Sequence, residues 1–319
     1  MCSLHSTGGR YVQIHTTIEY YSPDPCVIAL GCFDGVHRGH AEVIKTAKKA
    51  AQIRHLPLCV FTFAAPPRNY FIPRSVPLIT DTAEKLSILE DIGVDRALCL
   101  PLSHEIFSIT PEDFIDKILA GRLRAVHVVC GFNYTFGAKG VGNTELLKQR
   151  CETLGIGVTV VPEFTMDGVA ISSSLVREAV KNGDMETAKK YLGRSFFLRS
   201  TVVNGQHLAR TLGFPTVNTV PDPKLLLPKN GVYATRISFD GIQKFGITNV
   251  GVRPTVNTGI TCAETHIFDF CGDLYGKEIT VEFLHFLRPE RKFPSVEIMA
   301  EQIRADIETA KEILSLNDM

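Results

Sequence analysis

The sequence feature that most limits the possible folds of this chain is an apolar run, Val27–Gly31, followed at once by glycine and histidine residues. The run has the length of a buried strand, and after a glycine-containing turn the stretch Ala41–Ala51 has helical periodicity. A strand, a glycine turn and a helix in this order present backbone N–H groups and a helix N-terminus to an anion. Because His37 and His40 stand at the junction, and Gly39 allows close approach of a ligand, we expect a phosphate-binding site there.

The histidine pair has two other interpretations. A histidine at a helix start is usually a surface or capping residue, and two histidines can belong to a metal site. No cysteine or carboxylate stands at ligand spacing beside His37 and His40, so the metal site is the weaker interpretation.

Length and composition limit the class of protein. A chain of 319 residues is long enough to split into two domains. Its net charge of zero gives no reason to expect binding to nucleic acid, so any anion site must be local. The sequence has no signal-peptide pattern at its start and no apolar run near the roughly 20 residues of a membrane helix. Nine scattered cysteines without a CxxC pair favour reduced thiols and a cytoplasmic location.

The first half of the chain alternates apolar runs with helical stretches, which predicts a doubly wound parallel sheet. The candidate strands are Val27–Gly31, Leu58–Phe63, Ala97–Leu100, Val126–Cys130 and Val158–Val161, and the candidate helices follow His40 or lie near Asp81–Ile92, Pro111–Leu119 and Thr144–Leu154. Asp81 with Glu84, and Thr110 with Pro111, are helix start signals. Ligands of such sheets bind at the carboxyl ends of the strands, where His37 and Asn133 should lie.

The second half of the chain has a different pattern of apolar residues. Ile171–Arg199 predicts short helices, and after it come short alternating or aromatic-rich runs that predict a small antiparallel β-barrel. These runs are Thr201–Gly205, Val232–Phe239, Gly246–Val250, Thr265–Phe270 and Ile279–Leu287, and a last helix is expected near Ser295–Leu314. We therefore predict an α/β domain over residues 1–186 and an all-β barrel domain with a C-terminal helix over residues 187–319.

Three motifs in the first half resemble one family. Phe33–His40 reads Phe-Asp-Gly-Val-His-Arg-Gly-His and resembles the HxGH signature of nucleotidylyltransferases, in the longer form of bacterial FAD synthetases. Gly131–Thr144 is a glycine-rich stretch whose part from Gly137 to Thr144 nearly spells a P-loop, but Asn143 stands where the lysine belongs. The stretch is instead similar to a segment of FAD synthetases that lies over the nucleotide and flavin phosphates. Ile171–Arg177 resembles the third element, ISSTxxR, with Ser174 in place of the usual threonine.

This resemblance implies that the first half transfers the adenylyl group of ATP to FMN and releases pyrophosphate. It implies catalytic roles for His37 and His40 as hydrogen-bond donors to the reacting phosphates. The implied ATP-binding and phosphate-binding residues are Gly31, Phe33, Asp34, Gly39, Asn133, Ser172, Ser173, Ser174 and Arg177, and Asn133 is also implied in flavin binding. The chain departs from the family at Phe63–Arg68, which has no histidine where the family has a Pro-His-Pro turn.

The stretch Val202–Asn218 resembles the GRxLGFPTAN signature of riboflavin kinases, with Ala209 in place of its first glycine. Thr216 and Asn218 alternate onto one face of an extended segment, and their side-chain oxygens suit Mg²⁺ and ATP phosphates. The resemblance implies ATP binding at Gly213, Thr216 and Asn218. It also implies that Glu264 accepts the proton of the riboflavin hydroxyl that attacks the γ-phosphorus. Arg288 is assigned to flavin binding, with a surface ion pair as the alternative.

The sequence is identified as a member of the bacterial bifunctional riboflavin kinase/FMN adenylyltransferase family, over nearly its whole length. The expected activities are phosphorylation of riboflavin to FMN by the barrel and adenylylation of FMN to FAD by the α/β domain, with Mg²⁺ and ATP. Two alternatives stay open: a single retained activity, or a non-catalytic flavin-binding regulatory protein. The expected partners are riboflavin, FMN and ATP, without nucleic acid or membrane, in a monomer or a homo-oligomer.

Overall fold

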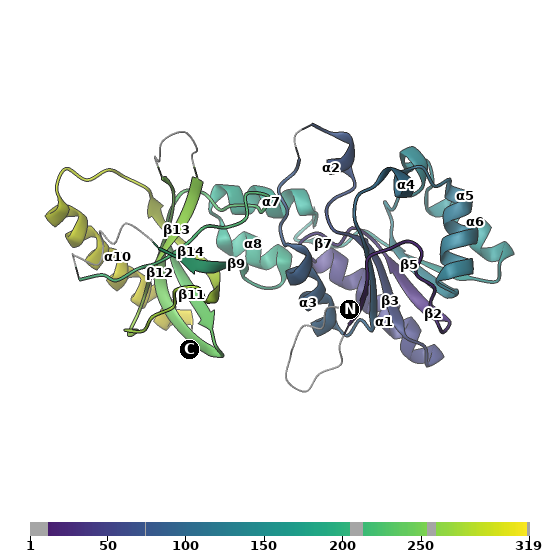
Figure 1. Ribbon diagram of the computed structural model, residues 1–319, viewed down its shortest axis with the longest axis horizontal. Coiled ribbons are helices and arrows are strands. Elements are labelled where there is room, and N and C mark those ends of the chain that lie inside the picture. Colours follow the sequence, from purple (N-terminus) through teal and green to yellow (C-terminus); the bar gives the residue numbers. More distant parts are fainter. Residues whose placement is uncertain (1–11, 74, 205–212, 254–259, 318–319) are drawn as a thin grey trace. The chain divides into compact units, whose positions relative to one another are not determined.

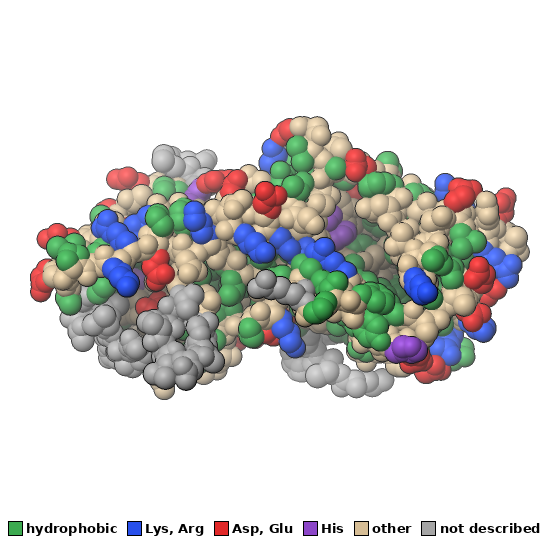
Figure 2. All heavy atoms as spheres, turned by 90° about the horizontal axis from the view of Figure 1, so that it is seen from above, with side chains coloured by type: hydrophobic (Ala, Val, Ile, Leu, Met, Phe, Trp, Pro, Cys, Tyr) green, Lys and Arg blue, Asp and Glu red, His purple; other side chains and the backbone are tan. Residues whose placement is uncertain are grey.

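The computed structural model describes residues 12–73, 75–204, 213–253 and 260–317 (Figure 1). The chain divides into two compact units, Met1–Ser173 and Ser174–Met319. The domain boundary that we predict, between residues 186 and 187, falls inside helix α8 (Met185–Leu192) and stays a prediction. On the face displayed in Figure 2, acidic and basic side chains are both spread along the chain, in keeping with its net charge of zero.

The first unit contains a six-stranded sheet whose strands all run parallel, in the order β1-β4-β3-β2-β5-β6. Its strands are β1 (Gln13–His15), β2 (Cys26–Leu30), β3 (Leu58–Phe63), β4 (Arg96–Leu100), β5 (Ala125–Gly131) and β6 (Gly157–Val161). The five predicted strands are confirmed to within one residue at either end. The sequence does not predict β1, because a strand this short with two exposed side chains has no periodic signal.

Helices cover both faces of this sheet, as predicted. The helices of this unit are α1 (Arg38–Arg54), α2 (Arg68–Phe71), α3 (Thr82–Ile92), α4 (His104–Phe107), α5 (Pro111–Asp113), the π-helical η1 (Phe114–Arg122), the 3₁₀-helical η2 (Ala138–Gly140) and α6 (Thr144–Thr153). Alternate residues of a strand point to opposite faces. Ile28 and Leu30 of β2 therefore pack in a cluster with η1 and α6, whereas Val27 and Ala29 pack in another with α1 and α3.

The helix start signals form the expected caps. The Asp81 side chain accepts a hydrogen bond from the Glu84 N–H, and the Glu84 side chain accepts one from the Asp81 N–H. Thr110 caps α5 through the N–H of Asp113, with Pro111 at the first helical position. The single helix predicted over Pro111–Leu119 is wrong in one respect, since the short α5 continues as the wider η1.

The second unit is a closed antiparallel barrel in the strand order β10-β13-β12-β11-β14-β9. Its elements are α7 (Ser173–Asn182), α8, β9 (Phe196–Val203), β10 (Val217–Thr219), β11 (Gly231–Phe239), β12 (Ile242–Arg253), β13 (Ile260–Ile267), β14 (Glu278–Pro289) and α10 (Val296–Asn317), and α7 follows a short hairpin of β7 (Thr165–Met166) and β8 (Val169–Ala170). The barrel and the C-terminal helix confirm the predicted fold class.

Two predictions for this half are corrected by strand pairing. Phe196–Arg199, predicted as the end of a helical region, is the first half of β9, because Phe196 and Leu198 alternate into the barrel core while the strand pairs with β14. The strand predicted over Thr265–Phe270 lies earlier along the chain, at Ile260–Ile267. There it pairs with β12 along its whole length.

The barrel has a filled interior and a covered outer face. Inside it, the hydroxyl groups of Thr235, Thr248 and Thr265 form a fully buried chain with oxygen–oxygen distances of 2.9 Å. Outside it, Val232 of β11 packs in an apolar cluster with Ile307 of α10. Residues of neighbouring strands that pair directly share a face of the sheet. Val232 pairs with Asn249, and Asn249 pairs with Glu264, so these two polar residues lie on the same outer face.

Candidate functional site

The loop after β2 has an unusual backbone. Phe33, Gly35 and Val36 have φ angles of 51°, 75° and 38°, in the left-handed region that β-branched and bulky residues rarely adopt. Such conformations persist only where the surroundings hold them, and they gather at functional sites. Gly31 leaves room for the buried Phe33 ring, because a Cβ atom at this position would lie 2.7 Å from Cζ of that ring and would force it to shift.

Asp34 anchors this loop. Its side chain is 3% exposed and accepts a hydrogen bond from the Ile79 N–H at 3.0 Å. The hydroxyl of Ser173, at the start of α7, donates to the backbone carbonyl of Asp34 at 3.1 Å. The N–H of Gly35 donates to Oγ1 of Thr80 at 3.2 Å. The carboxylate of Asp34 thus holds the protein's own backbone, and its predicted role toward ATP stays a prediction.

The two histidines of the motif lie against one another. His37 is the N-cap residue of α1 and is 5% exposed, and its Nδ1 accepts a hydrogen bond from the His40 N–H at 3.3 Å. The imidazole rings stack with centroids 3.6 Å apart. Because an accepting Nδ1 carries no proton, the proton of a neutral His37 sits on Nε2, where it can be donated to a ligand. Gly39 packs against the His37 ring, and a Cβ there would lie 3.2 Å from its Cε1.

The remaining predicted residues of the first half fall in two places. Asn133 is exposed in the loop after β5, at the same carboxyl edge of the sheet as His37. Ser172 and Ser173 lie at the start of α7, whereas Ser174 and Arg177 follow in the same helix, beyond the division between the two units. Their predicted phosphate contacts stay predictions.

Asn143 explains why the second glycine-rich stretch is not a P-loop. It is the N-cap residue of α6, and its side chain accepts a hydrogen bond from the Leu146 N–H at 2.9 Å. The side chain that would have to reach a terminal phosphate is therefore used to start a helix.

An aromatic cluster at the end of β3 is missed by the sequence analysis. Phe107 of α4 lies 5.9 Å from Phe63, 4.8 Å from Tyr70 and 5.0 Å from Phe71, between ring centroids. Tyr70 and Phe71 belong to α2 and remain 40% and 59% exposed. The cluster lies beside Phe63–Arg68, the segment that lacks the family's histidine. In the sequence, the adjacent aromatic residues Tyr70 and Phe71 shortly after two prolines are the signal that could have indicated this cluster.

The barrel has a cavity of about 270 Å³ between its outer face and α10. Thr216, Glu264 and Arg288, predicted separately from the sequence, all line it. The rest of its wall combines apolar and polar side chains: Phe214, Val232, Ile247, Phe293, Met299 and Ile303, with Asn249, His266, Glu290, Arg291 and Asp306. A cavity that combines apolar side chains with convergent polar and charged groups is typical of a ligand site.

Strand register brings three polar residues of the barrel together. Asn218 of β10 pairs directly with Glu264 of β13, and Glu264 pairs directly with Asn249 of β12. Directly paired residues have Cβ atoms about 5 Å apart on one face of a sheet. Asn249 is a site residue that the sequence analysis does not select, because only the register of β12 and β13 places it beside Glu264.

His266 and Arg288 hold the rim of this cavity. Nδ1 of His266 donates to the carbonyl of Pro215 at 2.9 Å, which fixes the segment before β10 against β13. Nε and a terminal nitrogen of Arg288 donate to the Asp306 carboxylate at 2.9 and 2.8 Å, and Asp306 is only 5% exposed. Arg288 thus ties β14 to α10, so the ion-pair interpretation holds for its guanidinium, and its predicted flavin contact stays a prediction.

A second barrel cavity, of about 530 Å³, adjoins the first at Thr216. It is lined by β9, β10 and β13 and by the loop Phe270–Tyr275. Gly213 precedes it with a φ of 85°, which requires glycine. Ala209, where the riboflavin kinase signature has a glycine, lies outside the described residues.

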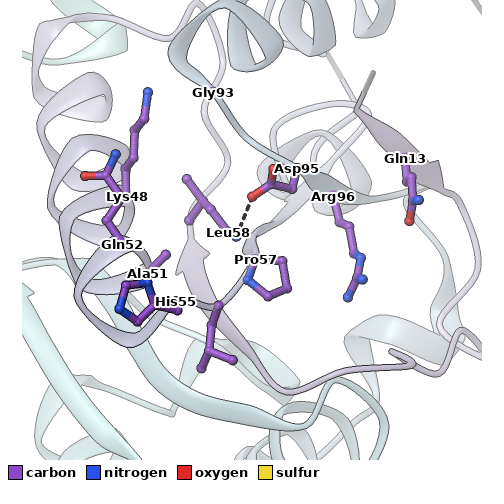
Figure 3. Close-up of a pocket in the computed structure, with 11 residues that line it drawn as sticks. Gln13, Lys48, Ala51, Gln52, His55, Pro57, Leu58, Gly93, Asp95 and Arg96 are labelled. Carbon is purple, nitrogen blue, oxygen red and sulfur yellow. Dashed lines mark hydrogen bonds between the residues drawn. The ribbon is translucent and has the colours of Figure 1, made fainter. Parts of the chain in front are cut away.

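Another cavity, of about 590 Å³, lies at the amino edge of the parallel sheet (Figure 3). Its charged groups already bind the protein: Lys48 donates to the Ile92 carbonyl at 2.6 Å, Asp95 accepts from the Leu58 N–H at 2.9 Å, and Arg96 pairs with Asp24 at 2.7 Å. Ligands of parallel sheets bind at the opposite edge. We therefore assign no site to this cavity.

Two features are absent from the part of the chain that the structure describes. In residues 12–73, 75–204, 213–253 and 260–317, no group of three or more His, Cys, Asp or Glu side chains could hold a metal ion. In the same ranges, no helix combines the length and apolar character needed to cross a membrane.

The chain matches two family models, FAD synthetase over residues 20–175 and riboflavin kinase over residues 192–314. It is 37% identical over 287 residues to a bifunctional riboflavin kinase/FMN adenylyltransferase of Pseudomonas fluorescens, which covers 90% of this chain and 92% of that protein. The enzyme of the same name from Bacillus subtilis is 35% identical over 289 residues, covering 89% and 91%. A solved structure from Streptococcus pneumoniae, described as a macrolide-efflux protein, has a TM-score of 0.87 at 31% identity and covers 95% of this chain and 99% of its own.

Proposed function

The chain belongs to the family of bifunctional riboflavin kinases/FMN adenylyltransferases, and from this premise we propose how it makes FAD in two steps. The barrel half phosphorylates riboflavin to FMN, and the sheet half joins FMN to the adenylyl group of a second ATP. Its relatives carry the names of both activities. The observation that carries the site assignment is that Thr216 and Glu264, distant in the sequence, line one cavity together with apolar side chains that a flavin ring could contact.

In the sheet half, an oxygen of the FMN phosphate attacks the α-phosphorus of ATP and pyrophosphate leaves. No protein nucleophile is needed, so the rate depends on positioning and on stabilising the charge of the transition state. His37 is oriented for this role, because its Nδ1 accepts a hydrogen bond from the His40 N–H, and the proton of a neutral ring then sits on Nε2, the atom proposed to donate to a phosphate oxygen. The His40 ring stacks on the His37 ring, and His40 lies in the first turn of α1.

The flavin ring of FMN is proposed to bind at the aromatic cluster of Phe63, Tyr70, Phe71 and Phe107. These side chains lie at the carboxyl edge of the sheet, as ligand-binding groups of parallel sheets do. The exposed rings of Tyr70 and Phe71 offer a surface on which a planar ring can stack. The cluster thus offers flavin binding without the histidine that this chain lacks.

In the barrel half, riboflavin is proposed to occupy the cavity of about 270 Å³ and ATP the adjoining one of about 530 Å³. Thr216 lines both cavities, so a phosphate bound at Thr216 would lie between the two substrates. Glu264 lines only the smaller one, where its carboxylate can accept the proton of the attacking riboflavin hydroxyl. The apolar side chains of α10 would contact the flavin ring.

Mg²⁺ is proposed as the partner of ATP in the barrel. Thr216, Asn218 and Glu264 offer hydroxyl, amide and carboxylate oxygens, which are the hard ligands that Mg²⁺ prefers. Mg²⁺ usually binds through few protein oxygens together with substrate phosphates, so this donor set fits. When bound, the ion would neutralise phosphate charge, and the protein's part is to supply and orient these oxygens.

We further propose that the protein works in the cytoplasm, since all eight cysteines that the structure describes are thiols. The domain boundary is proposed at residue 186, between the two matched regions.

Product analysis by chromatography tests the proposal. The purified chain is incubated with Mg-ATP and either riboflavin or FMN, and the fluorescent flavins are separated. We expect FMN from riboflavin and FAD from FMN. A chain that converts only one substrate has a single activity, and a chain that converts neither would overturn the enzymatic proposal in favour of a flavin-binding protein.

A further inference from the structure

Lys85 of α3 is a buried cation that the two-step mechanism does not use. Its side chain is 1% exposed, and its ammonium group donates to the backbone carbonyls of Cys32 and Phe63, at 3.3 Å for Cys32. Among the described residues, no carboxylate forms an ion pair with it. A buried charge without an opposite charge is costly, so a lysine placed here needs a compensating role.

The two carbonyls that Lys85 binds lie at the carboxyl ends of neighbouring strands. Cys32 follows β2 and begins the left-handed loop, and Phe63 is the last residue of β3, next to the aromatic cluster. The carbonyl of Cys32 also accepts a hydrogen bond from Oγ1 of the fully buried Thr62, at 2.7 Å. Two buried polar side chains from different elements therefore fix one carbonyl of the loop.

Fixing this carbonyl also fixes the N–H group on the other side of the peptide bond. In a trans peptide the C=O and N–H point in opposite directions, and the described chain has no cis peptide bond. With its oxygen turned toward Lys85, the Cys32–Phe33 peptide directs the Phe33 N–H away from Lys85. This N–H donates to no other described residue.

We propose that Lys85 is a positioning residue for adenylyl transfer. It sets the orientation of the Cys32–Phe33 peptide, and its positive charge lies behind the loop that faces the phosphates. This inference rests on the proposed adenylyltransferase activity of the sheet half. It explains why a cation is buried at the one edge of the sheet where anionic substrates are expected.

Lys85→Met tests the proposal, because methionine keeps most of the side-chain length and removes the charge. We expect kcat for FAD formation to fall by about 10- to 100-fold, as for other groups that orient a site from behind, and the Kd for pyrophosphate measured by calorimetry to rise about tenfold. Lys85→Arg keeps the charge and should recover pyrophosphate binding. Riboflavin kinase activity reports on the barrel and should be unchanged.

Lys48→Met is the matched control. Lys48 of α1 also donates to a backbone carbonyl, that of Ile92, but at the amino edge of the same sheet. Its loss should reduce stability without changing kcat or pyrophosphate affinity. If Lys48→Met lowers kcat and pyrophosphate affinity as much as Lys85→Met does, the loss in Lys85→Met is a general structural effect and the proposal is wrong.

Thr62→Val provides an independent test if Lys85→Met does not fold. It removes the other hydrogen bond to the Cys32 carbonyl without changing shape or charge. We expect a smaller decrease in kcat, about three- to tenfold, at unchanged circular dichroism. If the wild-type chain makes FAD and both Lys85→Met and Thr62→Val keep its kcat, the proposal is overturned. Absence of FAD from the wild type would instead overturn the proposed function.

Discussion

The two units build their sites in opposite ways. In the sheet unit, one short loop between β2 and α1 carries Phe33, His37 and His40, and its shape depends on left-handed backbone conformations. In the barrel unit, Asn218 and Glu264 sit on regular strands, and no unusual backbone is needed to bring them together. One site is made by a local conformation and the other by strand register.

This difference predicts which substitutions should reduce the activity of each site. A loop held in sparsely populated conformations depends on every group that restrains it, such as Gly31 beneath the Phe33 ring or the Asp34 side chain on the Ile79 N–H. A site on paired strands shares the stability of the barrel, because each residue is held by ladder hydrogen bonds on both sides. Changes to backbone restraints should damage the first site, and changes to single functional groups should damage the second.

The largest expected effect is that of Glu264→Gln on riboflavin kinase activity. Glutamine keeps the shape of the side chain and cannot accept the hydroxyl proton, so kcat should fall by about 10²- to 10⁴-fold. FAD formation from FMN should not change. Both rates are measured by flavin chromatography on the same preparation.

Glu278→Gln is the control for this variant, since Glu278 opens β14 and its side chain is 65% exposed. It should leave both activities as they are. A Glu264→Gln variant that keeps kinase activity would show that Glu264 does not accept the hydroxyl proton and that Asn218, Asn249 and Glu264 serve only in binding.

Gly31→Ala should damage only the sheet unit, by about 10²-fold in kcat for FAD formation. The added Cβ would lie 2.7 Å from the Phe33 ring, so the ring and the left-handed loop must move. A displacement of about 1 Å at a reacting centre can cost about 10²-fold in rate. Steady-state kinetics with FMN, with kinase activity as the folding control, check this prediction. An active Gly31→Ala variant would break the contrast between the two units.

The same contrast explains what the sequence could predict. His37 and His40 lie three residues apart, so a motif of eight residues contains both side chains and predicts that they serve one site, whereas the stacking of their rings is seen only in the structure. Thr216, Glu264 and Arg288 were predicted one by one from separate motifs, but their common cavity depends on the closure of the barrel. Asn249 and Lys85 were missed for the same reason. Each becomes notable only through a partner that register or packing supplies, namely Glu264 and the Cys32 carbonyl.

The smallest predicted effect concerns acid stability of the sheet unit. Burial, followed by the charge of Arg54, lowers the pKa of His127, and burial, followed by the charge of Arg96, lowers the pKa of His15. The folded state then binds fewer protons than the unfolded state, whose histidines titrate near 6.5. This contribution is therefore fully present above pH 6.5 and decreases as the pH falls below it.

Urea unfolding at pH 7.5, 6.5 and 5.5, followed by hydrogen exchange of peptides from β5 and β12, separates the two units in this test. Protection of β5 should decrease below pH 6.5 in the wild type. His127→Gln should weaken that pH dependence, because it removes the group that resists protonation, while an amide can still reach Oγ1 of Thr159, which His127 contacts at 2.8 Å. If β5 loses protection equally in the variant, other groups cause the acid sensitivity. If β5 stays as protected at pH 5.5 as β12 does, the sheet unit is no more sensitive to acid than the barrel unit. The two units then differ only in how they place their functional groups.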